Sequence, residues 1–496
     1  MTRRLDLVGP ALAILGGVVF LLRGFDGELS RDLALYAYAG QRVADGVPPY
    51  VGVMNRSGPL AHLVPGAGAW TGDLVGMDDL LAIRGLFMVV SMLVVWVTYL
   101  LVRDVVGSRP AAAVAALFAA MLPPIVLYAV GGPRDKTVMM LFLTAMLLAT
   151  VRGRWAVAGA SLALATLTWQ PVFFLGAATV AVAALLATAR RGGALLRVAV
   201  AGVLTTLVFV AGFAVAGALP EALDGFVRIH LSETYQPGFG DDPEATWETT
   251  REAYGAAIYL LVAGLAALPL LAVPCLLRLA RRRTTPEGRA RDVALVAATA
   301  GELVGLAWSW RTFNGWADAL VLVPYAALGL GGLLALVVGR LPRRAGVAVA
   351  VVACLVLLGS GVRYAVTERD TTLVRQRAEV AAVVEVLPDA SMLSIEAPQP
   401  LVLAHRVNPS EHQMFRLGLE AYVDRTWPGG LDGYAEWIAE TRPTIVAVGR
   451  GAHYDWLMPT LRADYVRFGT SPGWYWYVDR DTDPDVLARL ERAVGS

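Results

Sequence analysis

Apolar runs long enough to cross a lipid bilayer recur along the chain and limit its fold more than any other feature. A helix of about 20 mostly apolar residues spans a hydrocarbon core roughly 30 Å thick. Of the 496 residues, 56% are hydrophobic and 17% are charged, whereas a soluble domain is about a quarter charged. No basic stripe with interleaved aromatic residues exists, which argues against a nucleic-acid partner. We therefore expect an all-α polytopic membrane bundle.

Hydropathy predicts about eleven transmembrane helices. The apolar runs place them at about 5–22, 80–102, 111–130, 137–151, 155–169, 172–189, 198–219, 255–277, 293–310, 316–338 and 345–363. The fourth and fifth are short, so tilted or re-entrant segments remain alternatives there.

Arginine placement predicts the orientation of the bundle. Basic residues accumulate in cytoplasmic loops, and six alternate connections carry them: Arg3 and Arg4, Arg103 and Arg109, Arg152 and Arg154, Arg190 to Arg197, Arg278 to Arg291, and Arg340 to Arg344. The two long loops at about 23–79 and 220–254, and the tail, then lie on the extracytoplasmic side. Lys136 is the only lysine, a bias that suggests a GC-rich bacterial genome. We expect a multi-pass protein of the bacterial inner membrane.

Two domains are expected, a transmembrane domain over 1–363 and a small extracytoplasmic α/β domain over 364–496. Two short buried strands, Ser391–Ile395 and Thr444–Val448, are bounded by turn residues. An amphipathic helix is expected over 371–387, and two aromatic segments near Tyr465–Phe468 and Trp474–Val478 suggest a hairpin.

A polar loop follows the first apolar run and holds the first candidate acid. Asp32 begins a helical stretch that runs from Leu33 to Val43, and Tyr36 lies one turn further on. One interpretation makes Asp32 a reactive carboxylate. The other makes it an N-cap or a first-turn acid that favours the helix dipole.

Two further elements of this loop could contact substrate. Tyr50 ends the turn-rich segment Gly46–Tyr50, and Arg56 lies in the turn Asn55–Leu60. A guanidinium group fits phosphate oxygens well, so Arg56 is a candidate phosphate ligand. The alternative is that it binds lipid headgroups.

Polar residues also interrupt the apolar sequence in two short connections. Arg134, Asp135 and Lys136 lie between two predicted spans, where charge is expensive unless it is paired or used. Arg311 and Asp318 flank the aromatic connection between two later spans, where Arg311 could hold a lipid phosphate and Asp318 could orient it. In both places the alternative is an ion pair that only fixes helix packing.

The second long loop contributes Glu233 as a candidate substrate ligand. The turn-rich sequence from Arg228 to Asp242 is typical of a loop that covers a substrate. Asp241 and Asp242 invite a metal interpretation, but adjacent carboxylates alone favour plain solvation.

These residues together resemble the GT-C glycosyltransferases, in the branch of the protein O-mannosyltransferases and aminoarabinose transferases. In that branch the first loop reads acid, Ala-x-Tyr, then Gly-x-x-x-Tyr, then a Pro-Leu turn. Asp32, Ala34 and Tyr36, then Gly46–Tyr50, then Gly58–Leu60 are similar in order and spacing. The similarity covers about 30 residues of motif and roughly 340 residues of span layout.

The resemblance implies that Asp32 is the general base and that the donor is a polyprenyl-phosphate sugar. It also implies a second acid at Asp135 and a phosphate-binding role near Arg311. The chain departs from the branch in two places: Leu33 stands where many relatives have Glu, and Ala317-Asp318 stands where many have His-Tyr. Metal use therefore stays open, with a divalent cation neither required nor excluded.

We accordingly expect a glycosyltransferase that moves a hexosyl or pentosyl group, mannose among the candidates, to an envelope glycan, lipid or protein. Membrane lipid is a further expected partner. The tail could bind the acceptor through exposed aromatic residues such as Trp474 and Trp476. One alternative is a flippase for lipid-linked sugars, which should carry charged residues inside its spans and related halves. The sequence has few such charges, with Arg84 and Glu302 as the exceptions, and no internal repeat. The other alternative is a non-enzymatic envelope scaffold.

Overall fold

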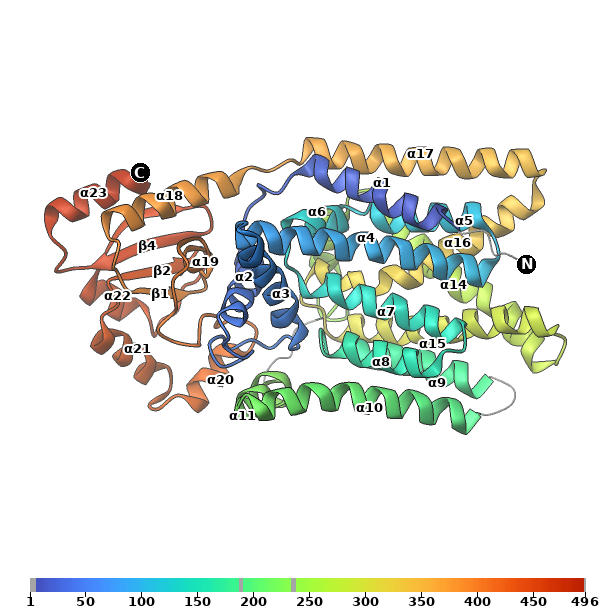
Figure 1. Ribbon diagram of the computed structural model, residues 1–496, viewed down its shortest axis with the longest axis horizontal. Helices are drawn as coiled ribbons and strands as arrows, with labels where there is room; N and C mark the ends of the chain where they lie inside the picture. The colour runs from blue at the N-terminus through green and yellow to red at the C-terminus, as the bar shows by residue number, and fades with distance from the viewer. Residues whose placement is uncertain (1–5, 187–190, 233–237, 495–496) are drawn as a thin grey trace. The chain divides into compact units, whose positions relative to one another are not determined.

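The computed structural model describes residues 6–186, 191–232 and 238–494 (Figure 1). The described residues form two compact units, each built from three stretches of the chain. Unit 1 comprises 1–24, 86–211 and 236–369, and unit 2 comprises 25–85, 212–235 and 370–496. The candidate Glu233 lies outside the described residues.

Unit 1 is a helical bundle. Its helices are α1 (Val8–Arg23), α4 (Asp79–Val106, which begins in unit 2), α5 (Arg109–Ala120), α6 (Pro123–Gly131), α7 (Asp135–Val151), α8 (Trp155–Thr166), α9 (Val172–Leu186), α10 (Arg191–Val215, which ends in unit 2), α13 (Pro243–Tyr254), α14 (Ala257–Ala280), α15 (Pro286–Arg311), the 3-10 helix η2 (Trp316–Leu322), α16 (Val323–Arg340) and α17 (Arg343–Thr367).

The helices of unit 1 pack closely. α9 lies along α15, and α14 lies along α16. A Cβ atom on Gly329 would stand 1.9 Å from the carbonyl oxygen of Gly264, so only glycine permits the approach of α14 to α16. Small residues at such crossings let membrane helices gain van der Waals contact without a hydrophobic driving force.

A helix stands at each predicted span, but not every helix is long enough to cross a membrane by itself. Among the described residues, six helices are long and apolar enough, or seven if the bent pair α5 and α6 forms one span. That pair bends by 62° at Pro123 and Pro124, because proline removes a donor and clashes with the preceding turn. The protein is therefore a multi-pass membrane protein, and the number of eleven spans stays a prediction.

Unit 2 joins helices from the long loops to a small sheet. The loop helices are α2 (Arg31–Ala44), α3 (Leu60–Val75), α11 (Leu219–Leu223), the π-helix η1 (Asp224–Arg228) and α12 (Ile229–Ser232). The rest are α18 (Thr372–Val386), β1 (Met392–Ile395), α19 (Gln399–Ala404), α20 (Leu419–Thr426), α21 (Gly430–Thr441), β2 (Ile445–Gly449), α22 (Met458–Asp464), β3 (Tyr465–Ser471), β4 (Trp474–Asp479) and α23 (Pro484–Val494). The α2 helix was expected, whereas α3 was not.

The sheet has the strand order β1-β2-β4-β3, with β1 and β2 parallel and the other pairs antiparallel. The two expected strands and the expected hairpin are present. Residues of α21, α22 and the strands form one apolar core that includes Leu393, Val446, Tyr434 and Ile438. On the sheet's edge side, α23 packs against β3 and α18.

The expectation that Trp474 and Trp476 are exposed is wrong. Both indoles are fully buried, and the Nε1 of Trp476 donates to the Oγ of Ser471 at 2.7 Å. Alternate residues of a strand face opposite sides, and in β4 the buried side is the one with the tryptophans, whereas Tyr475 and Tyr477 are part exposed. An acceptor surface built on these two tryptophans is excluded.

Candidate functional site

Two clusters of charged side chains hold half of the predicted site residues. The Asp32 cluster lies in unit 2 and contains Arg31, Asp32, Glu396, Arg416 and Tyr454. The Lys136 cluster lies in unit 1 and contains Arg134, Asp135, Lys136 and Asp318.

The first turn of α2 presents Asp32. Ser30 stands at the N-cap position and Asp32 is the second residue of the helix, so the first-turn placement is confirmed and the N-cap placement is wrong. An acid in the first turn is favoured by the helix dipole. The Asp32 side chain is 40% exposed, against 28% for Arg31, so this carboxylate is within reach of a substrate.

Arg31 joins Asp32 to a buried acid from the C-terminal segment. Its Nε and Nη2 each donate to Oδ1 of Asp32 at 3.1 Å, and its Nη1 donates to Oε2 of Glu396 at 2.8 Å. Burial opposes the charge on Arg31, but the two carboxylates outweigh it and raise the pKa of the guanidinium. Arg31 therefore stays charged and holds the Asp32 carboxylate in place.

Glu396 is itself held by a set of donors. Its Oε1 accepts from the backbone N of Phe415 at 2.6 Å, from that of Arg416 at 3.0 Å and from the hydroxyl of Tyr454 at 3.1 Å. The side chain is only 1% exposed, and Nε of Arg416 lies 3.7 Å from Oε2. Burial and then the Glu396 charge raise the pKa of Tyr454, so this phenol remains a donor.

The backbone at Glu396 is strained. The residue follows β1 directly and has φ of +57°, a left-handed conformation that costs a non-glycine residue of order 1 kcal/mol. Such strain persists where the surroundings over-determine a side chain, often at functional sites. Sequence analysis missed Glu396; its position directly after a buried strand was the only signal.

The expected tyrosines brace the first loop. The hydroxyl of Tyr36 lies 2.8 Å from Oγ of Ser57, and that of Tyr50 donates to the carbonyl of Ser57 at 2.7 Å. Both side chains are buried, Tyr50 has φ of +73°, and burial raises its pKa. The two hydroxyls thus hold the Asn55–Leu60 turn.

Arg56 lies on this turn and contacts two other segments of unit 2. Its Nη1 donates to the carbonyl of Leu417 at 3.3 Å, and its own carbonyl lies 2.7 Å from Nε2 of His230. His62, just after the turn, is 1% exposed and packs on Tyr50 with ring centroids 4.9 Å apart. These contacts give His62 a packing role beside the turn.

The Lys136 cluster is almost completely buried. Nζ of Lys136 lies 3.0 Å from Oδ2 of Asp135 and 3.4 Å from Oδ1 of Asp318, with side-chain exposures of 7%, 1% and 5%. Nε of Arg134 lies 3.4 Å from the other oxygen of Asp135. The short connection that holds Arg134, Asp135 and Lys136 therefore lies against the one that holds Asp318. In this cluster the two cations balance the two acids.

Aromatic rings surround this cluster. Lys136 lies over the ring of Trp169, 4.5 Å from its centroid, and Arg134 lies over Tyr128 at 5.6 Å. Tyr128 in turn stacks on Trp316 with centroids 5.3 Å apart. Cation–π contacts stabilise desolvated cations. The sequence alone did not predict this contact between Trp169 and Lys136, because the two residues lie in different connections.

Asp318 does not pair with Arg311. Its ion-pair partner within the described residues is Lys136, and its Oδ2 accepts from the backbone N of Asn314 at 3.0 Å. Arg311 ends α15 with an exposed side chain. The expectation that Asp318 orients Arg311 is wrong, because the 3-10 turn at Trp316–Leu322 directs this acid into the bundle.

No group of three or more acidic, histidine or cysteine side chains in the described part of the chain is placed to hold a metal ion. Asp242 instead caps α13 by accepting from the backbone N of Ala245 at 3.1 Å, and Asp241 accepts from that of Gly238 at 2.9 Å.

Comparison with known proteins identifies the fold. No family model and no curated protein sequence matches the chain. ArnT from Cupriavidus metallidurans, in a crystal structure with undecaprenyl phosphate, matches with a TM-score of 0.60 at 13% identity, over 99% of this chain and 98% of its own. The apo oligosaccharyltransferase of Archaeoglobus fulgidus matches with a TM-score of 0.54 at 15% identity, over 98% and 78%.

The same oligosaccharyltransferase tethered to an acceptor peptide also matches, with a TM-score of 0.54 at 14% identity, over 97% of this chain and 74% of that one. The chain therefore has the fold of the GT-C membrane glycosyltransferases, and the resemblance drawn from the first-loop motif is confirmed at that level. At these identities the likeness shows the fold, and the activity has to be argued from the site.

Proposed function

We propose that the protein is a membrane glycosyltransferase that moves a sugar from a polyprenyl-phosphate donor to an acceptor hydroxyl of the cell envelope. The observation that carries the proposal is the GT-C fold together with an exposed Asp32 held by Arg31. A related fold has been solved with undecaprenyl phosphate, which supports a lipid-phosphate donor. The site is proposed to face the extracytoplasmic side of a bacterial inner membrane.

Asp32 acts as the general base in this proposal. Its carboxylate takes the proton of the acceptor hydroxyl while the oxygen attacks the anomeric carbon of the sugar. The bond from that carbon to the phosphate oxygen breaks, and the electron pair leaves with the polyprenyl phosphate. Arg31 keeps the carboxylate ionised and oriented, and Glu396 fixes Arg31 and offsets its charge, which would otherwise make Asp32 a weaker base.

The leaving phosphate needs positive charge. Arg134 and Lys136 are the proposed source in unit 1, because both are held in place before substrate binds and little reorganisation is required. Arg56 and Arg311 are proposed as outer ligands of the phosphate or of neighbouring lipid headgroups. In this proposal the buried cations Arg134 and Lys136 stabilise the leaving phosphate, and the more exposed Arg56 and Arg311 contact it from outside.

A direct transfer assay tests the proposal. Purified protein in lipid nanodiscs would receive radiolabelled polyprenyl-phosphate mannose or polyprenyl-phosphate arabinose, with an envelope extract as acceptor and with or without EDTA. Label that enters the extract supports a glycosyltransferase and names its donor, and EDTA shows whether a divalent cation takes part. Donor binding without transfer or hydrolysis would contradict the proposal and favour a flippase or a scaffold.

A further inference from the structure

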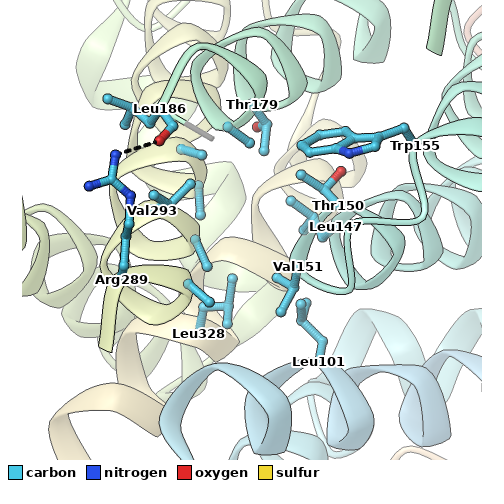
Figure 2. A pocket seen from close by; sticks show the side chains of 16 residues that line it. Leu101, Leu147, Thr150, Val151, Trp155, Thr179, Leu186, Arg289, Val293 and Leu328 are labelled. Atoms are coloured by element: carbon cyan, nitrogen blue, oxygen red, sulfur yellow. Dashed lines mark hydrogen bonds between the residues drawn. The ribbon is translucent and has the colours of Figure 1, made fainter. Parts of the chain in front are cut away.

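Unit 1 contains an apolar cavity that the proposed reaction does not use. It measures about 230 Å³ and lies between α4, α7, α9, α15 and α16, lined by side chains such as Leu101, Leu147, Val293 and Leu328 (Figure 2). The hydroxyls of the two threonines in its wall already have protein partners: Thr150 donates to the carbonyl of Met146 and Thr179 to that of Leu175, and the hydroxyl of Tyr325 lies 3.4 Å from Oγ1 of Thr179. An apolar cavity of this size favours an apolar occupant over water.

An arginine stands at the rim of this cavity. Nη2 of Arg289 donates to the carbonyl of Leu186 at 3.0 Å (Figure 2), and its Nε is buried without a hydrogen-bond partner in the described part of the chain. A buried guanidinium donor that is left unpaired is costly. The rim therefore offers hydrogen bonding and positive charge next to an apolar interior.

A second cavity adjoins the first and is more polar. It measures about 390 Å³ and shares Val151 and Ala290 with the apolar cavity. Its wall includes Arg152, Arg291 and one acid, Asp104. Nε of Arg152 pairs with Asp104 at 2.8 Å, whereas Arg291 has no ion pair with any described residue. The two cavities together present three guanidinium groups and one carboxylate.

The two cavities lie far from the Lys136 cluster. Val151 ends α7 and Asp135 begins it, and the intervening rise of about 1.5 Å per residue places them about 24 Å apart. This end of the bundle carries the arginine-rich loops, which the distribution of basic residues assigns to the cytoplasm. Basic pockets between membrane helices on that side bind anionic lipid headgroups.

We propose that the two cavities bind one anionic glycerophospholipid of the arginine-rich membrane face. One acyl chain fills the apolar cavity, and the phosphate lies against Arg289 and Arg291. Inorganic phosphate would leave the apolar cavity empty, and a neutral phospholipid would leave the net positive charge unbalanced. The bound lipid would link α7, α9 and α15.

Native mass spectrometry with phosphatidylglycerol and phosphatidylcholine tests this site. The purified full-length protein would be titrated with each lipid and compared with two variants. Arg289→Gln/Arg291→Gln removes the charge at the rim, and Ala298→Phe fills the cavity from a buried position on α15. Arg340→Gln/Arg343→Gln is the matched control, since both arginines are exposed outside the cavity walls.

The expected result is one tightly held phosphatidylglycerol, bound at least ten-fold more tightly than phosphatidylcholine. The charge variant should bind phosphatidylglycerol at least ten-fold more weakly than the wild type. The control variant should bind it as tightly as the wild type does. The same variants should lose the rise in melting temperature that phosphatidylglycerol gives to the wild type. Equal binding of both lipids, or undiminished binding in a folded charge variant, would overturn the proposal. Retention of a polyprenyl phosphate in place of the phospholipid would overturn it as well.

Discussion

The Asp32 cluster and the Lys136 cluster contain similar residues in opposite settings. In the first, a 40% exposed acid is held by an arginine whose other partner, Glu396, is buried. In the second, both acids and the lysine are at most 7% exposed. An exposed carboxylate can meet a substrate, whereas buried ions are costly unless each keeps its partner. The first cluster is therefore suited to proton transfer, whereas the second holds two cations in fixed positions against two paired acids.

Removal of the lysine should give the largest effect. Lys136→Met leaves Asp135 and Asp318 buried with Arg134 as the nearby cation, and breaking a buried pair costs about 3–5 kcal/mol. We expect a large fall in melting temperature, or no folded protein, measured in detergent or nanodiscs. Arg311→Gln, at an exposed position, should change stability by less than about 0.5 kcal/mol.

A double variant sharpens this result. Lys136→Met/Asp318→Asn removes one negative charge with the positive one, so it should recover part of the lost melting temperature. If Lys136→Met alone melts like the wild type, the cluster is not a buried charge network and the contrast between the two regions fails.

Loss of the buried acid in the Asp32 cluster should affect turnover more than folding or donor binding. Glu396→Gln leaves Arg31 paired to Asp32 alone and makes Asp32 a weaker base. A charge-assisted hydrogen bond is worth about 1.5–3 kcal/mol, so kcat should fall roughly 10- to 100-fold. The donor KM should stay within about two-fold.

Tyr454→Phe is the matched control for Glu396→Gln, because it removes one donor to Glu396 and keeps the carboxylate. It should lower kcat by less than about ten-fold, since one neutral hydrogen bond contributes about 1 kcal/mol. Equal losses in both variants, or a loss in Glu396→Gln that follows the melting temperature, would make Glu396 a folding residue only.

Acid should weaken unit 2 through His62. Burial holds the pKa of this imidazole at about 3, against 6.5 in the unfolded chain. Below pH 6.5 the unfolded chain binds a proton that the folded chain refuses, so stability falls as the pH drops toward 3. At about 1.36 kcal/mol per pH unit, the loss reaches about 2 kcal/mol at pH 5.

His62→Phe removes this titration and keeps a ring beside Tyr50. The variant should therefore lose less stability than the wild type between pH 7 and pH 5 in chemical unfolding. Parallel curves for the two proteins would show that this histidine is accessible to protons in the folded state.

The smallest effect is expected at Tyr36. Tyr36→Phe removes the hydrogen bond to Ser57 and should cost about 1 kcal/mol of stability. Transfer should stay within about three-fold of the wild type, because this hydroxyl braces a turn. A loss of 100-fold or more with an unchanged melting temperature would instead show that Tyr36 contacts the substrate.

Local signals in the sequence predicted most of the architecture. Apolar length located a helix at each expected span, and alternation with turn residues located the strands and the hairpin. Hydropathy reports burial in lipid and not helix ends, so it missed the polar first turns of α15 and the bend at Pro123. It also missed α3, which lies within the long loop predicted at about 23–79.

The candidate site was predictable only in part, because its pairings join distant segments. Arg31 and Glu396 are 365 residues apart, and no local pattern relates them. The partner of Asp318 was predicted to be its neighbour Arg311 and is Lys136, from the other short connection. Residue type and membrane side identified the candidates, whereas only the tertiary fold selects their partners.

Transfer and donor binding measured on one preparation of Asp32→Asn test the central claim most directly. Asparagine keeps the shape of the side chain and removes its basicity, and general-base catalysis contributes roughly 100- to 10,000-fold. Asp45→Asn, at the end of the same helix, is the control. We predict that Asp32→Asn binds the polyprenyl-phosphate sugar within about two-fold of the wild type and loses at least 100-fold in transfer. Transfer at the wild-type rate would remove Asp32 from the mechanism and contradict the account.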